Sequence, residues 1–228
     1  MQLTERQRRI ITQVVNAFET GSPEGDYAAT AIFHDGPHNI RQITYGRSQS
    51  TEYSSLRELV AAYVDAGGMF SEALRPYADR IGSVPLTDDA GFKSLLRRAG
   101  REDPVMRQIQ DAFFDRRYLL PTLGWAADEG FSLPLSALVI YDSWIHSGGI
   151  LWVLRQTFPD NPPSLGGEEK LWTQAYVTAR RTWLAGHARA IIRKTVYRPD
   201  CFQREIARNN WHLSEGPIDA NGALVNVL

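Results

Sequence analysis

The stretch AATAIFHDGPHNIRQITYG, residues 28–46, decides the fold class. Its two ends, 28–33 and 40–45, are short segments with high β-propensity. The loop from His34 to Asn39 that joins them is rich in residues that favour turns. This arrangement predicts a β-hairpin, and it is the one hairpin that the sequence predicts.

Helical periodicity surrounds this hairpin on both sides. Thr4 followed by Gln7 has the spacing of a capping box, and apolar residues then recur at helical intervals as far as Phe18. After the hairpin, the apolar pattern predicts helices at about 56–63, 70–77, 88–99, 103–117, 118–129, 133–147, 148–157, 168–194 and 199–209. The predicted fold class is therefore α+β and mostly α.

Composition limits the classes of function. The chain has 228 residues, of which 43% are hydrophobic and 22% charged, as in one globular unit or two small lobes around a shared cleft. The 25 Lys and Arg residues nearly balance the 26 Asp and Glu residues, so we expect neither nucleic acid nor an anionic membrane as partner. Cys201 is the single cysteine and cannot form an internal disulfide.

Two segments bear on membranes and export. The most apolar stretch, 133–154, is interrupted by Asp142, His146 and a Gly-Gly pair, and it falls short of the roughly 20 apolar residues that a membrane span needs. Residues 1–11 carry charges where a signal peptide would have its apolar segment. We therefore expect a soluble protein with no signal peptide in this chain.

Glu19 is the first candidate for chemistry. It continues the apolar face of the first helix at the point where that helix ends. Partial burial there would favour the protonated form of its carboxyl group, which is what a general acid needs. The alternative is a glutamate at a helix end whose side chain extends into solvent.

Asp35, in the hairpin loop, is the second candidate carboxylate. Asp-Gly is also a common turn dipeptide, so a purely structural role is the alternative. A glutamate that ends an apolar helix, followed by a hairpin with an aspartate and then by Thr44 and Gly46, is the order of a two-carboxylate glycoside hydrolase of the lysozyme type.

Short motifs spread over most of the chain carry a resemblance to a known family. They are Ala17-Phe18-Glu19, Arg41 with Thr44, Asp115-Arg116-Arg117-Tyr118, Tyr141-Asp142 with His146-Ser147-Gly148-Gly149, Ala179-Arg180-Arg181 and Arg198-Pro199-Asp200. With these motifs the sequence resembles the chitosanases of glycoside hydrolase family 46, which belong to the lysozyme superfamily.

The resemblance implies a lysozyme-like fold of two lobes with a cleft between them. One catalytic domain would cover residues 1–228, with a small β lobe at about 20–52, joined by the N-terminal helix, and a mainly helical lobe at about 53–228. It also implies an inverting mechanism in which Glu19 is the general acid, Asp35 the general base, and Thr44 holds the attacking water by its hydroxyl group.

Further residues receive roles from the same resemblance. Arg41 would keep a catalytic carboxylate ionised and contact substrate, and Tyr118 and His146 would line the cleft. Asp142, Arg180 and Arg198 would form a structural ion network behind it.

The sequence departs from the family pattern at three positions, one of which is His187, near the place where the family carries a glutamate of the ion network. When Arg41 and Thr44 are aligned, Asn39 takes the position of the general base, whereas alignment on Asp-Gly selects Asp35. We expect Asp35, because an amide cannot activate water. The acid that recognises the substrate amine falls on Ser54 or Ser55, and Glu52 is the nearest carboxylate and the expected substrate contact.

Other signals favour ordinary structural roles. Helical spacing assigns most of the six tryptophans to the core, and Cys201 is expected to be an inert thiol. His34 and His38 flank Asp35, but two loop histidines without a third ligand rarely hold zinc, so we expect no metal and no cofactor.

The sequence therefore predicts an endo-acting glycosidase that cleaves the β-1,4-glucosamine linkages of chitosan. Two alternatives stay open, a muramidase that acts on peptidoglycan and a carbohydrate-binding protein that has kept the fold without the activity. We expect a polysaccharide as the partner, a monomer, and, from the resemblance, an extracellular or periplasmic location.

Overall fold

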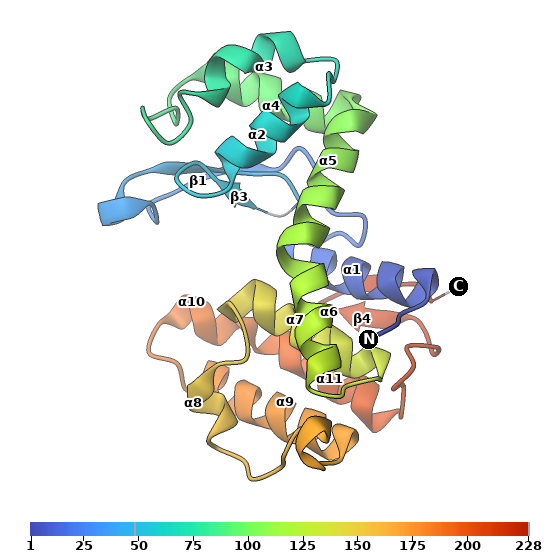
Figure 1. Ribbon diagram of the computed structural model, residues 1–228. Helices are drawn as coiled ribbons and strands as arrows, with labels where there is room; N and C mark the ends of the chain where they lie inside the picture. The colour runs from blue at the N-terminus through green and yellow to red at the C-terminus, as the bar shows by residue number, and fades with distance from the viewer. Residues whose placement is uncertain (48, 228) are drawn as a thin grey trace. The chain divides into compact units, whose positions relative to one another are not determined.

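The computed structural model describes residues 1–47 and 49–227 and confirms the α+β, mostly helical class (Figure 1). The α-helices are α1 (Glu5–Thr20), α2 (Leu56–Asp65), α3 (Ser71–Ala78), α4 (Ala90–Glu102), α5 (Pro104–Phe114), α6 (Leu120–Asp128), α7 (Pro134–Ser147), α8 (Trp152–Arg155), α9 (Glu169–Ala185), α10 (Ala190–Arg193) and α11 (Tyr197–Ala207). The strands are β1 (Thr30–Phe33), β2 (Gln42–Tyr45), β3 (Ser50–Thr51), β4 (Ile218–Ala220) and β5 (Ala223–Val225).

The chain divides into two compact units. The first consists of Met1–Glu24 with Arg117–Leu228, and the second is the continuous segment Gly25–Arg116. The predicted lobes had a single boundary near residue 52. In the structure, α1 belongs with the segment after residue 117, and α2 to α5 belong with the three-stranded sheet.

The start of α1 follows the prediction. The Thr4 hydroxyl accepts a hydrogen bond from the Gln7 backbone N–H at 3.2 Å, and the Gln7 side chain accepts one from the Thr4 backbone N–H at 3.0 Å. The helix extends to Thr20 and ends at Gly21, whose φ of 77° lies in the left-handed region. Its apolar face is buried from Ile10 to Phe18, which brings the end of the helix into the interior.

The predicted hairpin is confirmed, and a third strand extends it. β1 and β2 pair antiparallel with Ile32 opposite Ile43, and β2 also pairs with β3, which sequence reasoning missed. Alternation along β2 separates its side chains, because Ile43 and Tyr45 belong to the core and Gln42 and Thr44 lie on the other face.

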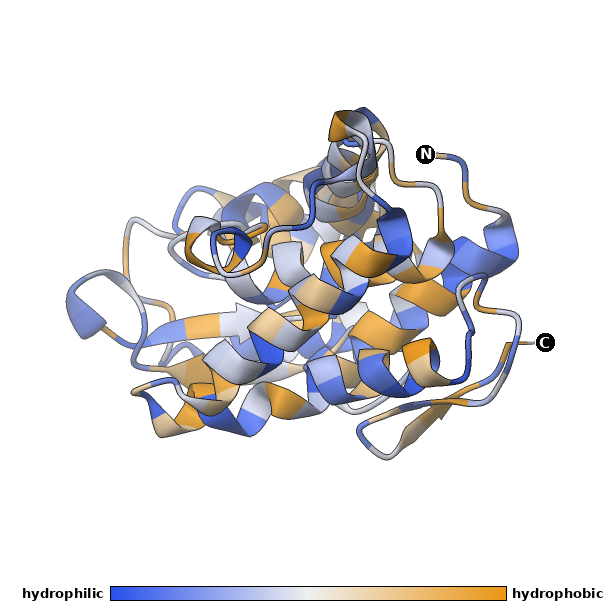
Figure 2. Ribbon diagram, turned by 90° about the horizontal axis from the view of Figure 1, so that it is seen from below, coloured by the Kyte–Doolittle hydropathy of each residue, from blue (hydrophilic) through white to orange (hydrophobic). Residues whose placement is uncertain are grey.

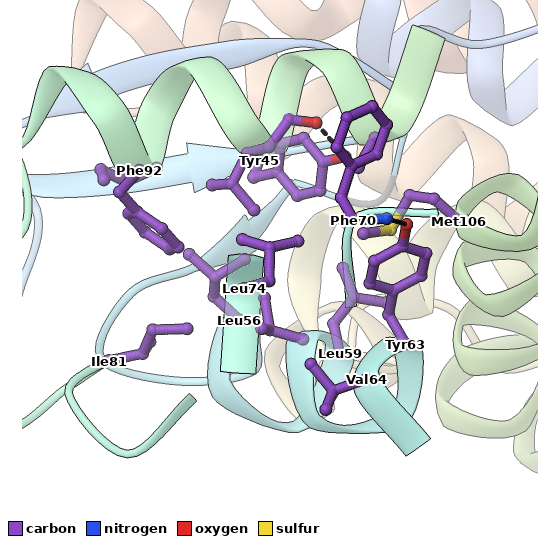
Figure 3. Packing of buried hydrophobic residues seen from close by; sticks show 14 of the residues in the cluster. Tyr45, Leu56, Leu59, Tyr63, Val64, Phe70, Leu74, Ile81, Phe92 and Met106 are labelled. Atoms are coloured by element: carbon purple, nitrogen blue, oxygen red, sulfur yellow. Dashed lines mark hydrogen bonds between the residues drawn. The ribbon is translucent and has the colours of Figure 1, made fainter. Parts of the chain in front are cut away.

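The core of the second unit lies between this sheet and helices α2 to α5 (Figure 3). The Tyr45 hydroxyl donates to the Leu96 carbonyl at 2.7 Å, so the one polar atom of this buried ring is satisfied. Tyr63 and Asp103 tie α2 to the loop before α3, because Asp103 accepts from the Tyr63 hydroxyl at 2.5 Å and from the Met69 backbone N–H at 2.7 Å.

The first unit is built around α7. Every residue from Pro134 to Ser143 on this helix is buried, which explains why its sequence is apolar on all sides. Other helices mix hydrophobic and hydrophilic residues along their length, as amphipathic surface helices do (Figure 2). On α9, the Trp172 ring stacks on Tyr176 with centroids 5.2 Å apart. Within residues 1–47 and 49–227, no helix combines the length and apolar character needed to cross a bilayer.

Three predicted elements differ in the structure. The long helix expected at 168–194 is wrong as one element, since α9 ends at Ala185 before Gly186 and the His187 ring accepts the Arg189 backbone N–H at 3.1 Å. The expected 148–157 helix shrinks to α8 after the glycine pair. The helix expected at 103–117 ends at Phe114 and passes into a π-helical turn, Asp115–Leu119.

Candidate active site

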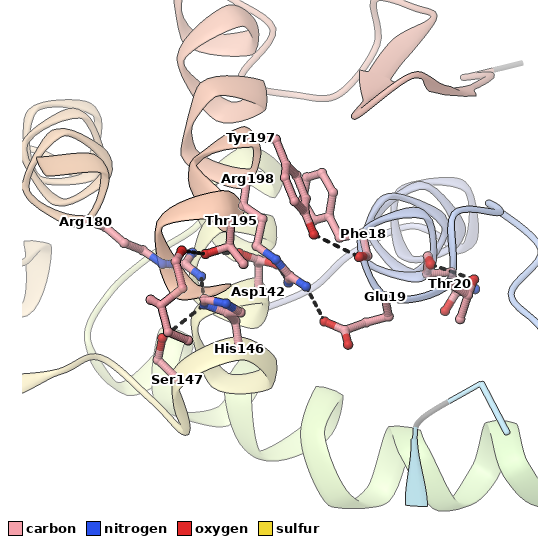
Figure 4. A network of polar contacts seen from close by, with 12 residues as sticks. Phe18, Glu19, Thr20, Asp142, His146, Ser147, Arg180, Thr195, Tyr197 and Arg198 are labelled. Atoms are coloured by element: carbon pink, nitrogen blue, oxygen red, sulfur yellow. Dashed lines mark hydrogen bonds and ion pairs between the residues drawn. The ribbon is translucent and has the colours of Figure 1, made fainter. Parts of the chain in front are cut away.

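Glu19 lies in the last turn of α1, in the first unit. Its side chain is 18% exposed, and its Oε1 accepts a hydrogen bond from Nη2 of Arg198 at 2.5 Å (Figure 4). The alternative of a solvent-extended glutamate is therefore wrong. Because the buried face of α1 precedes it, the helix sets this side chain at the edge of the interior, where it meets α11.

Arg198 also joins Glu19 to a buried aspartate. Its Nη1 donates to Oδ1 of Asp142 at 2.7 Å, and Nη1 of Arg180 donates to Oδ2 of the same carboxylate at 2.6 Å (Figure 4). All three side chains are almost fully buried. The structure thus brings together α7, α9 and α11 through the three residues expected to form an ion network.

Electrostatics keep this network ionised. Burial acts to raise the pKa of Asp142, but the charges of Arg180 and Arg198 outweigh it and hold that pKa below its usual value. Burial likewise acts to lower the pKa of Arg198, yet Asp142 and then Glu19 raise it above its usual value. Asp142 and the two guanidinium groups therefore stabilise one another in a region with little solvent.

His146 lies one turn after Asp142 on α7. Burial and the charges of Arg198 and Arg180 lower the pKa of this half-buried ring to about 4. The ring is therefore neutral at neutral pH, and its Nδ1 lies 3.3 Å from Nη2 of Arg180. A neutral ring can accept from Arg180 without adding a third positive charge.

Asp35 lies in the second unit, in the loop that joins β1 to β2. Its side chain is exposed, and Oδ1 accepts a hydrogen bond from Nε2 of Gln42 at 2.9 Å. Gln42 is buried, and its Oε1 accepts the Tyr53 backbone N–H at 3.4 Å. Sequence reasoning missed Gln42, although its place on the same strand face as Thr44 was available from the two-residue period.

Asn39, the other residue aligned with the general base, has a different setting. It is exposed and lies in the turn Pro37–Asn39 with a φ of 61°, a left-handed value that asparagine tolerates. The Gly36 backbone N–H donates to the Ile40 carbonyl at 3.1 Å and closes this turn. Asp35 is thus the loop carboxylate that the structure attaches to the sheet.

Thr44 is buried beside Gln42 on β2. Its Oγ1 is inaccessible to solvent and has no hydrogen-bond partner among the described residues. The hydroxyl group therefore has unused bonding capacity, but solvent does not reach it in this structure, and its predicted contact with the attacking water stays a prediction.

The expected pairing of Arg41 with a catalytic carboxylate is wrong. Both terminal nitrogens of Arg41 contact Asp88, each at 3.1 Å, in a bidentate ion pair that joins the hairpin to the loop before α4. The side chain is 44% exposed, so it stays accessible to a ligand. Its sequence neighbours gave no indication of a partner 47 residues away.

The expected substrate contact by Glu52 is also wrong. This side chain is 1% exposed, and its two oxygens accept the backbone N–H groups of Ile43 at 3.1 Å and Leu86 at 2.7 Å. The carboxylate therefore holds the strand and the loop before α4 together, and its burial leaves neither oxygen accessible to a substrate amine.

The remaining predicted residues have clear positions. Tyr118 is half-buried in the π-helical turn, and the Arg117 guanidinium lies 5.8 Å from the centre of its ring. Cys201 is fully buried, and burial raises the pKa of its thiol to about 12, so it stays protonated. His34 and His38 are exposed, and the described part of the chain contains no group of three or more metal-ligating side chains.

Comparisons with known proteins identify the family and the fold. The model of the family described as Glycosyl hydrolase family 46 matches residues 13–218. A chitosanase of this family from Gynuella sunshinyii, solved with chitotetraose, is 24% identical and covers 98% of both chains at a TM-score of 0.81. Native chitosanase from Bacillus subtilis MY002 is 23% identical and covers 99% of this chain and 100% of its own at a TM-score of 0.80.

At these identities the structural likeness shows the shared fold. A search of curated proteins finds no match. The family model, by contrast, spans most of the sequence, from the middle of α1 to the start of β4. The protein therefore belongs to glycosyl hydrolase family 46 and is a glycosidase.

Proposed function

We propose that the protein is an endo-acting chitosanase that cleaves β-1,4-glucosamine linkages with inversion. The observation that carries the proposal is the position of Glu19, partly buried at the end of α1 and held at 2.5 Å by Arg198. In its protonated form, a carboxyl group at this place can donate a proton to a bound glycosidic oxygen. The family membership supplies the reaction class, hydrolysis of a glycosidic bond.

Glu19 donates its proton to the glycosidic oxygen as the bond between that oxygen and the anomeric carbon breaks. Proton transfer leaves Glu19 as a carboxylate, and Arg198 stabilises the charge that forms. Asp142 keeps Arg198 in place, since it binds the other terminal nitrogen at 2.7 Å. The role of Arg198 is therefore to stabilise the Glu19 carboxylate that remains after the proton has been transferred.

Asp35 removes a proton from a water molecule while the water oxygen attacks the anomeric carbon from the opposite face. Inversion needs the two carboxyl groups roughly 6.5 to 9.5 Å apart, so that the water fits between Asp35 and the sugar. Gln42 supports this role, because its donation at 2.9 Å fixes the Asp35 carboxylate on the loop. The Thr44 hydroxyl group would bond the same water once substrate binding gives that water access to it.

Chitosan is favoured as the substrate because the similar structures include complexes with chitotetraose and with six glucosamine units. Burial of Glu52 keeps peptidoglycan as the second candidate, since the nearest carboxylate for amine recognition is engaged by two backbone N–H groups. Either polymer lies outside the cytoplasm, which supports an extracellular or periplasmic location.

The test measures reducing ends released from chitosan and from purified peptidoglycan in parallel. The wild type is compared with Glu19→Gln and Asp35→Asn, and Glu24→Gln, an exposed carboxylate four residues after α1, is the matched control. We expect chitosan cleavage by the wild type and the control, and a loss of about 100-fold or more in both catalytic variants.

Other results would change the proposal. Loss in Glu19→Gln alone would place the base elsewhere. Cleavage of peptidoglycan alone would identify a muramidase. If the wild type binds chitosan and releases no reducing ends from either polymer, the protein is a carbohydrate-binding protein on this fold.

A further inference from the structure

A pocket in the first unit shares no residue with the predicted catalytic set. Its volume is about 520 Å3, within the range of small-molecule sites. It lies among α6, the end of α7, α8, the loop around Pro162 and α9. Four of the six tryptophans line it: Trp125, Trp144, Trp152 and Trp172.

The tryptophans present ring surfaces of different accessibility. Trp152 is 72% exposed, while Trp125 and Trp144 are half-buried with their ring centres 5.1 Å apart. Tryptophan is highly buried on average, so the exposed ring of Trp152 beside the pocket leaves a large apolar face available to a ligand. Tryptophan is also the ring that attracts cations most strongly.

Two polar side chains that line the pocket can each form a further hydrogen bond. Trp172 is only 1% exposed, yet its indole N–H has no acceptor among the described residues. Glu129 receives one hydrogen bond from described side chains, from the Ser164 hydroxyl to Oε2 at 2.8 Å. A ligand can supply an acceptor for the indole and a donor for the second carboxylate oxygen.

The helix end in the pocket favours a positive charge. α7 ends at Gly148, whose φ of 77° is left-handed, and Gly148 and Gly149 both line the pocket. The last carbonyl groups of a helix carry a partial negative charge, which adds to the charge of Glu129.

Arg155 is the one cation that lines the pocket, and the loop already engages it. Its Nη1 donates to the Phe158 carbonyl at 2.9 Å, and its guanidinium lies 4.9 Å from the centre of the Phe158 ring. Hydroxyl oxygens can still accept from its remaining N–H groups. The pocket therefore combines aromatic faces, a carboxylate and hydroxyl-binding donors.

We propose that this pocket is a second binding site for amino sugars, which holds a glucosamine unit of the polymer through Trp152 and Glu129. Glu129 accepts from the protonated amine, the tryptophan faces contact the sugar ring, and Trp172 donates to a hydroxyl oxygen. The proposal rests on the proposed function, since it takes a glucosamine polymer as the ligand. The pocket would tether the chain to its substrate without taking part in cleavage.

The test follows the indole N–H signal of Trp172 by NMR during titration of full-length Glu19→Gln, which prevents cleavage. The probes are glucosamine hexamer and N-acetylglucosamine hexamer. We expect the glucosamine hexamer to shift this signal, with binding about tenfold weaker after Trp152→Ala or Glu129→Gln. Val153→Ala on the same helix and Asp128→Asn beside Glu129 are matched controls, both exposed and outside the pocket lining.

Binding of the glucosamine hexamer without a shift at Trp172 would overturn the proposal, and so would equal affinity for the acetylated hexamer. Unchanged affinity in Trp152→Ala and Glu129→Gln would overturn it as well. Reducing-end release by the wild type is measured separately. Failure of that assay with a retained Trp172 shift would refute the proposed hydrolysis and support the pocket.

Discussion

The two predicted catalytic carboxylates are held in opposite ways. Glu19 meets a guanidinium group that is itself held by a buried aspartate, so charge fixes it. Asp35 lies on an exposed loop and is held by one hydrogen bond from the neutral amide of Gln42. The first carboxylate depends on three helices far apart in sequence, and the second on its own hairpin.

This difference teaches how the ion pairs beside each predicted carboxylate respond to change. In the first unit, Asp142, Arg180 and Arg198 are buried together and compensate one another. In the second, Arg41, which lies in the segment that joins the hairpin strands as Asp35 does, forms an exposed ion pair with Asp88. A change in a buried network leaves uncompensated charge, whereas a change in an exposed pair is compensated by water.

Asp142→Asn is expected to have the largest effect. It leaves two buried guanidinium groups without their carboxylate and should lower the free energy of unfolding by about 3 to 5 kcal/mol in urea denaturation. Asp88→Asn removes the exposed partner of Arg41 and should change it by less than about 1 kcal/mol. Equal effects of the two variants would show that the contrast between the units is wrong.

Glu52→Ala tests whether a buried carboxylate of the second unit is structural. It leaves the backbone N–H groups of Ile43 and Leu86 without their acceptor and should lower the free energy of unfolding by about 3 kcal/mol. Among molecules that remain folded, KM for chitosan should not change. A stable variant with a raised KM would return Glu52 to the role of a substrate contact.

His146→Gln tests the electrostatics of the first unit through pH. The folded pKa of about 4 lies below the usual 6.5, so the unfolded chain binds more protons between these values. The free energy of unfolding is therefore not reduced by His146 above about pH 6.5, and it decreases as pH falls towards 4. After allowance for the partial exposure of the ring, we expect this decrease to be about 2 kcal/mol. Thermal unfolding measured across this pH range should show a smaller decrease in stability for His146→Gln than for the wild type. His212→Gln, at an exposed position, is the control and should show the same decrease as the wild type.

Gln42→Met should have the smallest effect of these variants, and we expect it to change kcat and not KM. It removes the donor to Asp35 and should lower kcat about three- to tenfold with KM unchanged, because the carboxylate loses its fixed position. Gln156→Met, at an exposed position, is the control. In an Asp35→Asn background the same substitution should have no further effect, and an additive loss would separate Gln42 from Asp35.

Local signals in the sequence predicted local structure well. The Thr4 capping box and the β-prone segments around Asp35 specify their elements through neighbours three to ten residues away, so periodicity and turn residues suffice. The strands β3, β4 and β5 were missed because segments of two or three residues carry almost no periodic pattern.

Contacts between residues that lie far apart in the sequence could not be predicted from local patterns. Arg41 pairs with Asp88 and Glu52 binds the backbone of Leu86, and no local pattern distinguishes these partners from other residues of the same type. The contacts of Asp142 with Arg180 and Arg198 match residues that were named only because the sequence resembles a known family.

The contact between Glu19 and Arg198 joins residues 179 positions apart, and the whole second unit is inserted between them. During synthesis on a ribosome, Gly25–Arg116 emerges complete and can fold while α1 still waits for its partners. The proposed acid is therefore fixed only after residue 198 has been added. Nascent chains shorter than this would display the hairpin with Asp35 and still lack an organised acid, so the enzyme acquires its proposed activity only after α11 has been synthesised.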